Sequence, residues 1–389
     1  MSYSHNRILT THVGSLPRSQ QVTDLIFAQE NGEEFDVHEY ERVIAEAVHD
    51  VVDRQIKAGV DLISDGEQSK ISYATYIKDR ITGFEGDSPR RTPQDLEAFP
   101  SFMKRLAAAG GTPTYRRPRC TGPITAKSDA PLKADIANLR AAIKTISKAT
   151  SPVAAFMNAA SPGVIALFQP NDFYPSQTAY LEALAEAMRP EYEAIVDAGF
   201  ILQLDSPDLG LGRHMMFKDK PEEEYIRVAI QHVEIMNEAL RNIPADRARM
   251  HVCWGNYEGP HHCDVPMSVV LPIALRAKPQ ALLFESCNPR HQHEWTVFRD
   301  AKIADDKILI PGMLDSVSNF IEHPLLVAER IERFANIVGR DRVIAGTDCG
   351  FSTFAGYGNV DPNIVYAKLG ALAEGAAIAS ERLWGGRKS

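Results

Sequence analysis

One pattern recurs along the chain: an amphipathic helix, then a glycine, then a short apolar strand that ends in polar residues. Three clear copies predict helices over 39–58, 179–198 and 324–338. Glycine directly after a helix is the usual left-handed stop. The strands that follow, VDLISDGE, FILQLDSP and RVIAGTDCG, are apolar at nearly every position, which is typical of a parallel sheet buried on both faces. The pattern therefore predicts alternating strands and helices around a parallel sheet.

Nine segments qualify as strands, one more than a closed eight-stranded barrel needs. They are ILTTHVGS, VDLISDGE, RCTGPIT, AFMNAASPG, FILQLDSP, RMHVCWGN, ALLFESCN, ILIPGMLD and VIAGTDCG. We expect either ILTTHVGS or RCTGPIT to lie outside the barrel. Each segment ends in polar residues, where a (β/α)8 barrel builds its active site. A doubly wound open sheet is the alternative, but no GxGxxG follows a first strand. We therefore predict an α/β fold, a single (β/α)8 TIM barrel over residues 1–383.

Residues 85–119 interrupt this pattern. The segment is rich in proline, glycine and arginine and has one short helical stretch, around 94–108. We interpret it as an insertion or lid over the barrel, with a solvated loop as the alternative. Residues 384–389 are predicted to form a flexible tail.

Composition excludes several classes of protein. Of 389 residues, 44% are apolar and 24% charged, as in ordinary soluble domains. A net charge of −9 disfavours a nucleic-acid partner. No apolar run is long enough to cross a bilayer, and the first residues lack the apolar core of a secretory signal. Five cysteines are too few, and odd in number, for a disulfide framework. We expect a soluble, cytoplasmic protein with no membrane partner, and a homo-oligomer is left open.

Four residues at three strand ends form a candidate metal site: His251, Cys253, Glu285 and Cys349. His251 and Cys253 are two residues apart and so face the same side of an extended strand. An imidazole, two thiolates and a carboxylate suit zinc, and thiolates select against magnesium and calcium. The alternative is that the cysteines are buried as small apolar residues beside a hydrogen-bonded histidine.

Two other clusters imitate a metal site. One is His261, His262 and Cys263, in the proline- and glycine-flanked loop GPHHCDVP. The other is His291, His293 and Glu294 in PRHQHEW, where residues two apart diverge if the segment begins a helix. We expect neither cluster to bind metal directly.

A second set of residues predicts a substrate site beside the metal. Gly14, in HVGS, allows backbone N–H groups to approach a ligand closely. Glu67 and Asp205 follow apolar strands and cannot be buried unpaired without cost. Two such carboxylates facing one cavity can receive a substrate ammonium group. The alternative is that they cap helices.

Motifs spread over almost the whole chain carry a family resemblance. TTHVGSLPR, DGEQ, TGPIT, QLDSPDL, HVCWG, the FES strand, PRHQHEW, GTDCG and AKLGALAEGAAIAS together resemble the cobalamin-independent methionine synthase superfamily in its short, single-barrel form. HVCWGNYEGPHHCDVP and FESCNPRHQHEW look most like its epoxyalkane:coenzyme M transferase branch.

The resemblance implies roles for individual residues. His251, Cys253, Glu285 and Cys349 fall where the family binds its catalytic zinc. Gly14 and Ser15 match the stretch that holds the carboxylate of the thiol substrate, and Glu67 and Asp205 match the residues that hold its amino group. Two departures concern the alkyl donor. Val317, in PGMLDSVSN, replaces a histidine that assists methyl transfer, and the chain has no room for the second barrel of long methionine synthases. Both weaken the case for a polyglutamyl methyl-folate donor.

The activity implied is alkylation of a zinc-activated thiol, because zinc deprotonates the thiol and fixes it in place. The first hypothesis is transfer of a methyl group from an alkyl donor to homocysteine or a related thiol. The second is epoxide opening, or the reverse carbon–sulfur cleavage, with coenzyme M or another small thiol, whose sulfonate Arg18 can receive. The third is a non-catalytic barrel with structural zinc. Three residues are candidates for proton transfer to the leaving group: Asp315, His291 and His12.

Overall fold

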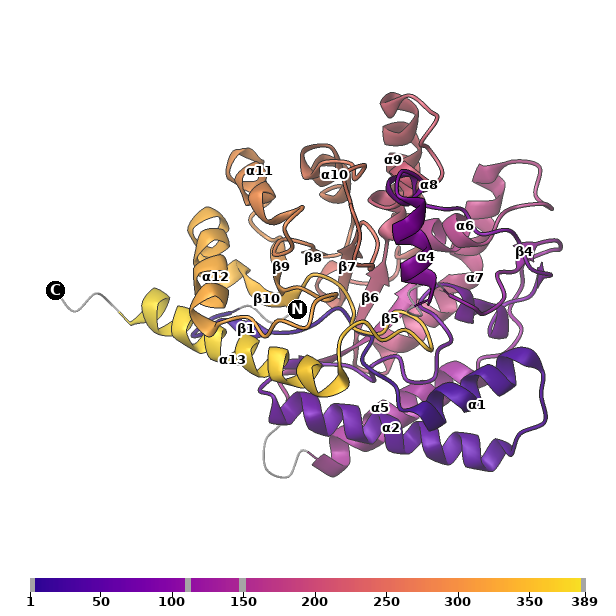
Figure 1. The fold of residues 1–389 in the computed structure, drawn as a ribbon, viewed down its shortest axis with the longest axis horizontal. Coiled ribbons are helices and arrows are strands. Elements are labelled where there is room, and N and C mark those ends of the chain that lie inside the picture. Colours follow the sequence, from indigo (N-terminus) through magenta and orange to yellow (C-terminus); the bar gives the residue numbers. More distant parts are fainter. Residues whose placement is uncertain (1–3, 109–112, 147–151, 386–389) are drawn as a thin grey trace.

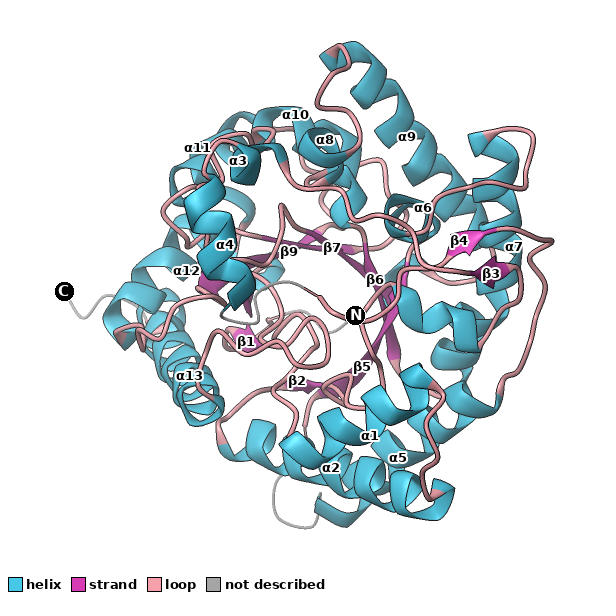
Figure 2. Ribbon diagram, turned by 45° about the vertical axis from the view of Figure 1, so that its right-hand side comes forward, coloured by secondary structure: helices cyan, strands magenta, loops and turns pink. Residues whose placement is uncertain are grey.

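Eight parallel strands form a ring with helices around its outside (Figure 1, Figure 2). The computed structural model describes residues 4–108, 113–146 and 152–385. The strand order is β1-β10-β9-β8-β7-β6-β5-β2. A parallel bridge between Thr11 and Leu62 joins the two ends of the sheet. The fold is a (β/α)8 TIM barrel, which confirms the prediction.

The barrel strands differ widely in length. They are β1 (Leu9–Thr10), β2 (Leu62–Ile63), β5 (Ala154–Ala160), β6 (Ile201–Asp205), β7 (Ala248–Val252), β8 (Ala281–Phe284), β9 (Ile308–Leu314) and β10 (Ile344–Thr347). ILTTHVGS supplies β1, so RCTGPIT is the candidate that lies outside the ring. It forms β4 (Arg119–Cys120), which pairs antiparallel with β3 (Phe84–Glu85) in a separate two-stranded sheet.

Helices follow the strands as the alternating pattern predicts. The longer ones are α1 (Gln20–Asn31), α2 (Val37–Lys57), α5 (Ala130–Ile146), α7 (Gln177–Asp197), α9 (Glu222–Ala239), α12 (Pro324–Val338) and α13 (Pro362–Trp384). The shorter ones are α6 (Pro162–Phe168), α8 (Gly212–Met215), α10 (Met267–Ala274), α11 (Trp295–Asp300) and the 3-10 turns η1 (Thr75–Asp79), η2 (Pro207–Leu209), η3 (Ala245–Arg247), η4 (Gln292–Glu294) and η5 (Arg340–Arg342). The three helices predicted from the pattern are α2, α7 and α12. No helix in the described part of the chain is both long and apolar enough to span a bilayer.

The local sequence accounts for these helices, as α2 illustrates. Asp36 begins it by accepting hydrogen bonds from the backbone N–H groups of His38 and Glu39. Val48 and Val52 lie on the buried face, four residues apart. Gly59, with φ 84°, then turns the chain away from the helix into β2.

Apolar side chains fill the amino-terminal end of the barrel. The cluster consists of Leu9, Val13, Leu62, Phe156, Ile201, Ala281, Leu283, Ile308, Ile310 and Ile344, several of which are the first residue of their strand. Next to it lies the fully buried Arg249, whose guanidinium is 3.4 Å from the Phe156 ring centroid. Arg249 donates hydrogen bonds to Thr11 Oγ1 and to the carbonyl of His12. The polar chemistry is therefore left to the carboxyl-terminal end.

The insertion of residues 85–119 begins and ends at the β3–β4 pair. The helix predicted around 94–108 occurs as two, α3 (Gln94–Glu97) and α4 (Pro100–Ala108), which lie across the ring in Figure 2. Residues 109–112 of the insertion, and 386–389 of the predicted tail, are outside the described residues.

Candidate metal centre and substrate cavity

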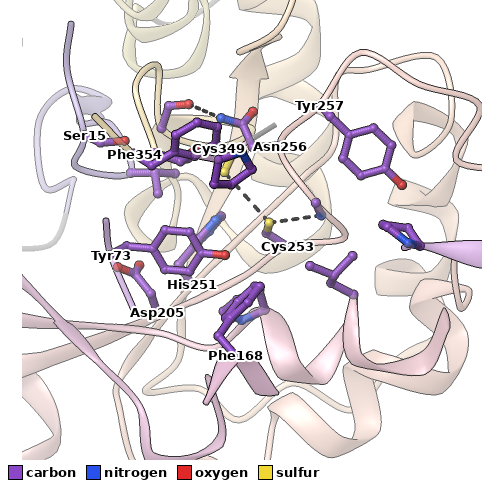
Figure 3. A pocket seen from close by; sticks show the side chains of 18 of the residues that line it. Ser15, Tyr73, Phe168, Asp205, His251, Cys253, Asn256, Tyr257, Cys349 and Phe354 are labelled. Carbon is purple, nitrogen blue, oxygen red and sulfur yellow. Dashed lines mark hydrogen bonds between the residues drawn. The ribbon is translucent and has the colours of Figure 1, made fainter. Parts of the chain in front are cut away.

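Three of the four predicted metal ligands come together at the carboxyl ends of β7 and β10. His251 lies in β7, Cys253 is the first residue after β7, and Cys349 lies two residues beyond the end of β10. One ligand atom from each residue lies within 4.8 Å of the other two, and the sulfur atoms are 3.8 Å apart (Figure 3). All three are buried. We call these residues the His/Cys triad.

The donor atoms of the His/Cys triad fit zinc. Neither ring nitrogen of the buried His251 has a hydrogen-bond partner, which is costly unless something else occupies the position. Burial lowers the pKa of His251 to about 3, so the imidazole is neutral, the form that binds metals. One nitrogen and two sulfurs with a fourth position open is a pattern of catalytic zinc sites, whereas structural sites are closed.

The fourth predicted ligand, Glu285, lies outside this group of three. Its Oε1 accepts a hydrogen bond from the Trp254 backbone N–H at 2.9 Å, and its Oε2 accepts one from Asn288 Nδ2 at 2.8 Å. Burial raises the pKa of Glu285 to about 7. Together with Cys349 and Asp315, it lines a second cavity beside the first. Its role as a ligand stays a prediction.

The two predicted amine-binding carboxylates line the same cavity as the His/Cys triad. Glu67 has a left-handed backbone, with φ 55°, which is strained for a residue other than glycine. Its Oε2 is buried without a hydrogen-bond partner. Burial raises the pKa of Glu67 to about 8, although the nearby Lys70 opposes the rise. An unpartnered carboxylate aimed at a cavity can receive a cationic group.

Asp205 is held in place by two side-chain amides. It ends β6, and burial raises its pKa to about 6. Asn158 Nδ2 donates to one carboxylate oxygen and Gln203 Nε2 to the other, both at 2.9 Å. Both amides also donate to the carbonyl of Val13, so they link β5 and β6 to the loop after β1. Asp205 is therefore fixed in orientation and has lone pairs left for a ligand.

Gly14 and Ser15 lie in the loop after β1, and Ser15 lines this cavity. Gly14 has φ 146°, and a Cβ there would lie 2.3 Å from Asn158 Oδ1, so no larger residue fits without displacing that amide. Ser15 lines the cavity next to Cys349 and Gly350. The predicted carboxylate-binding stretch thus lies at the same cavity as the predicted amine-binding residues.

Two of the three predicted proton donors, His12 and His291, lie away from this cavity. His12 is fully buried and its Nε2 lies 2.7 Å from Gln55 Oε1. Both ring nitrogens of His291 are occupied, by Glu294 at 2.8 Å and Asp264 at 3.0 Å, and these carboxylates raise its pKa to about 10 against the effect of burial.

Arg18, predicted as an anion receptor, is used structurally. Its guanidinium donates to the carbonyls of Glu67, Lys70 and Ser352 and to the Ser352 hydroxyl, which ties together the loops after β1, β2 and β10. Four hydrogen bonds leave it little capacity for a substrate sulfonate.

The two clusters that imitate a metal site have other partners. His261 contacts Asp264 and the carbonyl of Tyr257, each at 2.9 Å. In the part of the chain that the structure describes, the His/Cys triad is the only grouping of histidine, cysteine and carboxylate ligands close enough to hold an ion.

The insertion walls the cavity on its outer side. Leu96 and Leu106 line the cavity and pack against Tyr257. Asp95, fully buried, accepts a hydrogen bond from the Tyr257 hydroxyl at 2.7 Å and one from the His261 backbone N–H at 2.9 Å. These contacts anchor α3 to the loop that follows Cys253.

Several residues of the site were not predicted. Asn158 and Gln203 are polar residues inside apolar strands, a pattern that indicates a functional role and was available in the sequence. Tyr73 lines the cavity from an irregular segment and leaves no comparable pattern.

Known proteins resemble this chain along nearly its whole length. The model of the family described as "Cobalamin-independent synthase, Catalytic domain" matches residues 8–90. A methionine synthase of Saccharolobus solfataricus is 24% identical over 380 residues, which cover 96% of this chain and 95% of the relative. A methionine synthase of Sulfolobus acidocaldarius is 22% identical over 376 residues, covering 96% and 93%.

Solved structures share the fold. A B12-independent methionine synthase from Shewanella sp. W3-18-1 superposes with a TM-score of 0.70 at 18% identity, over 97% of this chain and 99% of that one. A putative vitamin-B12-independent methionine synthase from Listeria monocytogenes gives a TM-score of 0.61 at 18% identity, over 96% and 99%. The barrel is shared with these structures, and the family match over residues 8–90 and the relatives that span the chain show that it is similar to cobalamin-independent methionine synthases.

Proposed function

We propose that the chain is a zinc-dependent methyltransferase that transfers a methyl group to homocysteine or a closely related amino thiol. The observation that carries the proposal is the combination, in one cavity, of a buried His/Cys triad with two buried carboxylates. The triad suits a thiol sulfur and the carboxylates suit an ammonium group. The curated methionine synthases that match the chain over nearly its whole length support this activity.

The residues divide the work as follows. His251, Cys253 and Cys349 would hold the zinc ion, which supplies deprotonation of the substrate thiol at neutral pH. Glu67 and Asp205 hold the ammonium group, and Gly14 and Ser15 face the substrate carboxylate. Fixing both ends of the acceptor leaves its sulfur in one orientation, and orientation of this kind is a large part of enzymatic rate enhancement.

The competing hypotheses have less support. A sulfonate-bearing thiol needs a free cation, but Arg18 donates its hydrogen bonds to backbone carbonyls and a serine. Structural zinc needs a closed set of four ligands, whereas the His/Cys triad opens onto a cavity.

Metal content of purified variants tests the proposal. We expect about one zinc ion per chain in the native protein and loss of most of it in Cys253→Ser and Cys349→Ser, because thiolates provide two of the three proposed ligands. Cys263→Ser is the matched control, since Cys263 lies outside the triad, and it should retain zinc. Full zinc occupancy in both triad variants would refute the metal assignment.

Cobalt substitution then tests the acceptor. Homocysteine should change the visible spectrum of the cobalt protein because its sulfur enters the open position. Its analogue without the amino group, 4-sulfanylbutanoate, should bind about 10- to 100-fold more weakly, as expected for loss of a charge-assisted hydrogen bond. Equal affinities would show that Glu67 and Asp205 do not recognise an amine.

A further inference from the structure

The part of the cavity above the His/Cys triad is lined mainly by apolar and aromatic side chains. Besides Tyr257, which packs against the insertion, four aromatic side chains line the cavity: Tyr73, Tyr115, Phe168 and Phe354. We call these four the aromatic wall. Figure 3 shows three of them, Tyr73, Phe168 and Phe354, around the two sulfur atoms of the triad. An electrophile that reaches a thiol held by the triad must therefore pass against aromatic rings.

The rings of the aromatic wall are fixed relative to one another. Tyr73 and Phe168 are perpendicular, with centroids 5.8 Å apart, and Tyr115 and Phe354 are tilted, with centroids 6.0 Å apart. A backbone hydrogen bond from Tyr73 to Thr353 joins the two pairs. The face of an aromatic ring carries negative charge, and several such faces around one space bind methylated cations.

The charges in the cavity also favour a cation. Glu67 and Asp205 provide two carboxyl groups that line it, and a bound cation would favour their ionised forms. Arg90 is the only arginine or lysine among the described lining residues. It is exposed, donates to the carbonyl of Tyr115 and lies over the Tyr115 ring, 5.0 Å from the centroid. A donor with several carboxylates would find one guanidinium, already in contact with a ring.

The space available is small. The cavity has a volume of about 190 Å³, below the roughly 300–1,000 Å³ of sites for drug-sized ligands. A donor that shares this cavity with the acceptor is therefore a compact one.

None of the three predicted proton donors for a leaving group lines this cavity. Of the three predicted ones, His12 and His291 are buried elsewhere and Asp315 lines the neighbouring cavity. A leaving group that departs as a neutral molecule needs no proton.

We propose that the alkyl donor is a small methylated cation, an S-methyl sulfonium or N-methyl quaternary ammonium compound, held by the aromatic wall. This rests on the proposed function. The acceptor thiol loses its proton to solvent, its sulfur electron pair forms the new S–CH3 bond, and the donor's S–CH3 or N–CH3 bond breaks with its electron pair remaining on the donor. The products are a methyl thioether, a neutral sulfide or tertiary amine, and one proton.

Binding to the zinc-loaded protein with homocysteine present tests the cation. Choline and its uncharged isostere 3,3-dimethylbutan-1-ol have the same shape, so calorimetry on the pair isolates the charge. We expect choline to bind about ten-fold more tightly, and Phe168→Leu and Phe354→Leu each to remove most of that preference. Tyr73→Phe keeps the ring and should keep the preference. Phe173→Leu, in an exposed ring that does not line the cavity, is the control for aromatic loss.

Turnover tests the reaction. Trideuteromethyl-labelled trimethylsulfonium or tetramethylammonium with homocysteine should give labelled methionine, detected by mass spectrometry, and comparing the two identifies the onium class. These measurements apply to protein that binds zinc and homocysteine normally. In such protein, equal binding of choline and the isostere, or no labelled product from either donor, would overturn the proposed donor and would leave the proposed function standing. Failure to bind homocysteine would refute the proposed function itself and this inference with it.

Discussion

Replacing Glu67 by glutamine should weaken substrate binding and stabilise the free protein at high pH. The carboxyl group is 2% exposed and one of its oxygens has no hydrogen-bond partner. Burial raises its pKa from an ordinary 4.5 to about 8. The folded protein therefore keeps this proton over a pH range in which the unfolded chain has released it. Stability contributed by the group is lost as the pH rises from about 4.5 to about 8.

The size of the effect follows from that difference. At about 1.4 kcal/mol for each pH unit between the two values, the buried carboxylate costs up to about 5 kcal/mol above pH 8. Neighbouring cations such as Lys70 rearrange in the variant, so we expect a gain of about 2–5 kcal/mol in the free energy of unfolding at pH 9. At pH 5 the gain should be under about 1 kcal/mol, because pH 5 lies only about half a unit above the pKa of the unfolded chain.

Urea unfolding of chelator-treated protein at pH 5 and pH 9 measures this difference. Glu34→Gln, at an exposed position, is the matched control and should show no comparable dependence on pH. In the same Glu67→Gln variant, homocysteine should bind about 10- to 100-fold more weakly, while 4-sulfanylbutanoate should be little affected. Equal stabilities of variant and native protein at pH 9, or an undiminished preference for the amino thiol, would refute the reasoning.

Two further changes test the packing around the site. Tyr257→Phe removes the hydroxyl that donates to Asp95, so limited proteolysis should cut residues 85–119 roughly 5- to 30-fold faster. The control Tyr366→Phe should leave the cleavage rate unchanged. Equal rates in the two variants would mean that this hydrogen bond does not anchor the insertion. Gly14→Ala places a Cβ 2.3 Å from Asn158 Oδ1 and should weaken homocysteine binding measurably in calorimetry. Gly370→Ala, in α13 with open space around it, should be neutral or stabilising by up to about 1 kcal/mol, and similar binding by both variants would contradict the steric argument.

The barrel could be predicted because its strands and helices have different periods. Helical spacing in α2, α7 and α12 and fully apolar strands such as β8 are local properties of the sequence. Local sequence could not show whether ILTTHVGS or RCTGPIT supplies a barrel strand. Both are short and partly apolar, and only the closure of the ring, through the Thr11–Leu62 bridge, decides it.

The metal centre was predictable to the same extent. Alternation along β7 places His251 and Cys253 together, and the parallel sheet brings Cys349 to the same end. The sequence did not show which side chains are already held by hydrogen bonds to other residues. Glu285 is hydrogen-bonded to Trp254 and Asn288, and Arg18 to carbonyls of two other loops, and neither partnership follows a sequence pattern.

The aromatic wall could not be predicted for a related reason. Its rings come from four segments far apart in the sequence: Tyr73 from a loop after β2, Tyr115 from the insertion, Phe168 from α6 and Phe354 from the chain after β10. A single aromatic residue in a loop is unremarkable, and the set exists only once the barrel has closed.

The β3–β4 pair makes the insertion a replaceable module. Its two ends are pinned next to each other, with Phe84 opposite Cys120 and Glu85 opposite Arg119, so the distance between exit and re-entry is independent of what lies between. Residues in the intervening segment can be exchanged, lengthened or shortened with the barrel strands still in register. That segment supplies Leu96, Leu106 and Tyr115 to the outer cavity but none of the proposed metal or amine ligands. Under the proposed function, changes in this segment alter the outer cavity, where the alkyl donor enters, while the proposed acceptor site stays constant.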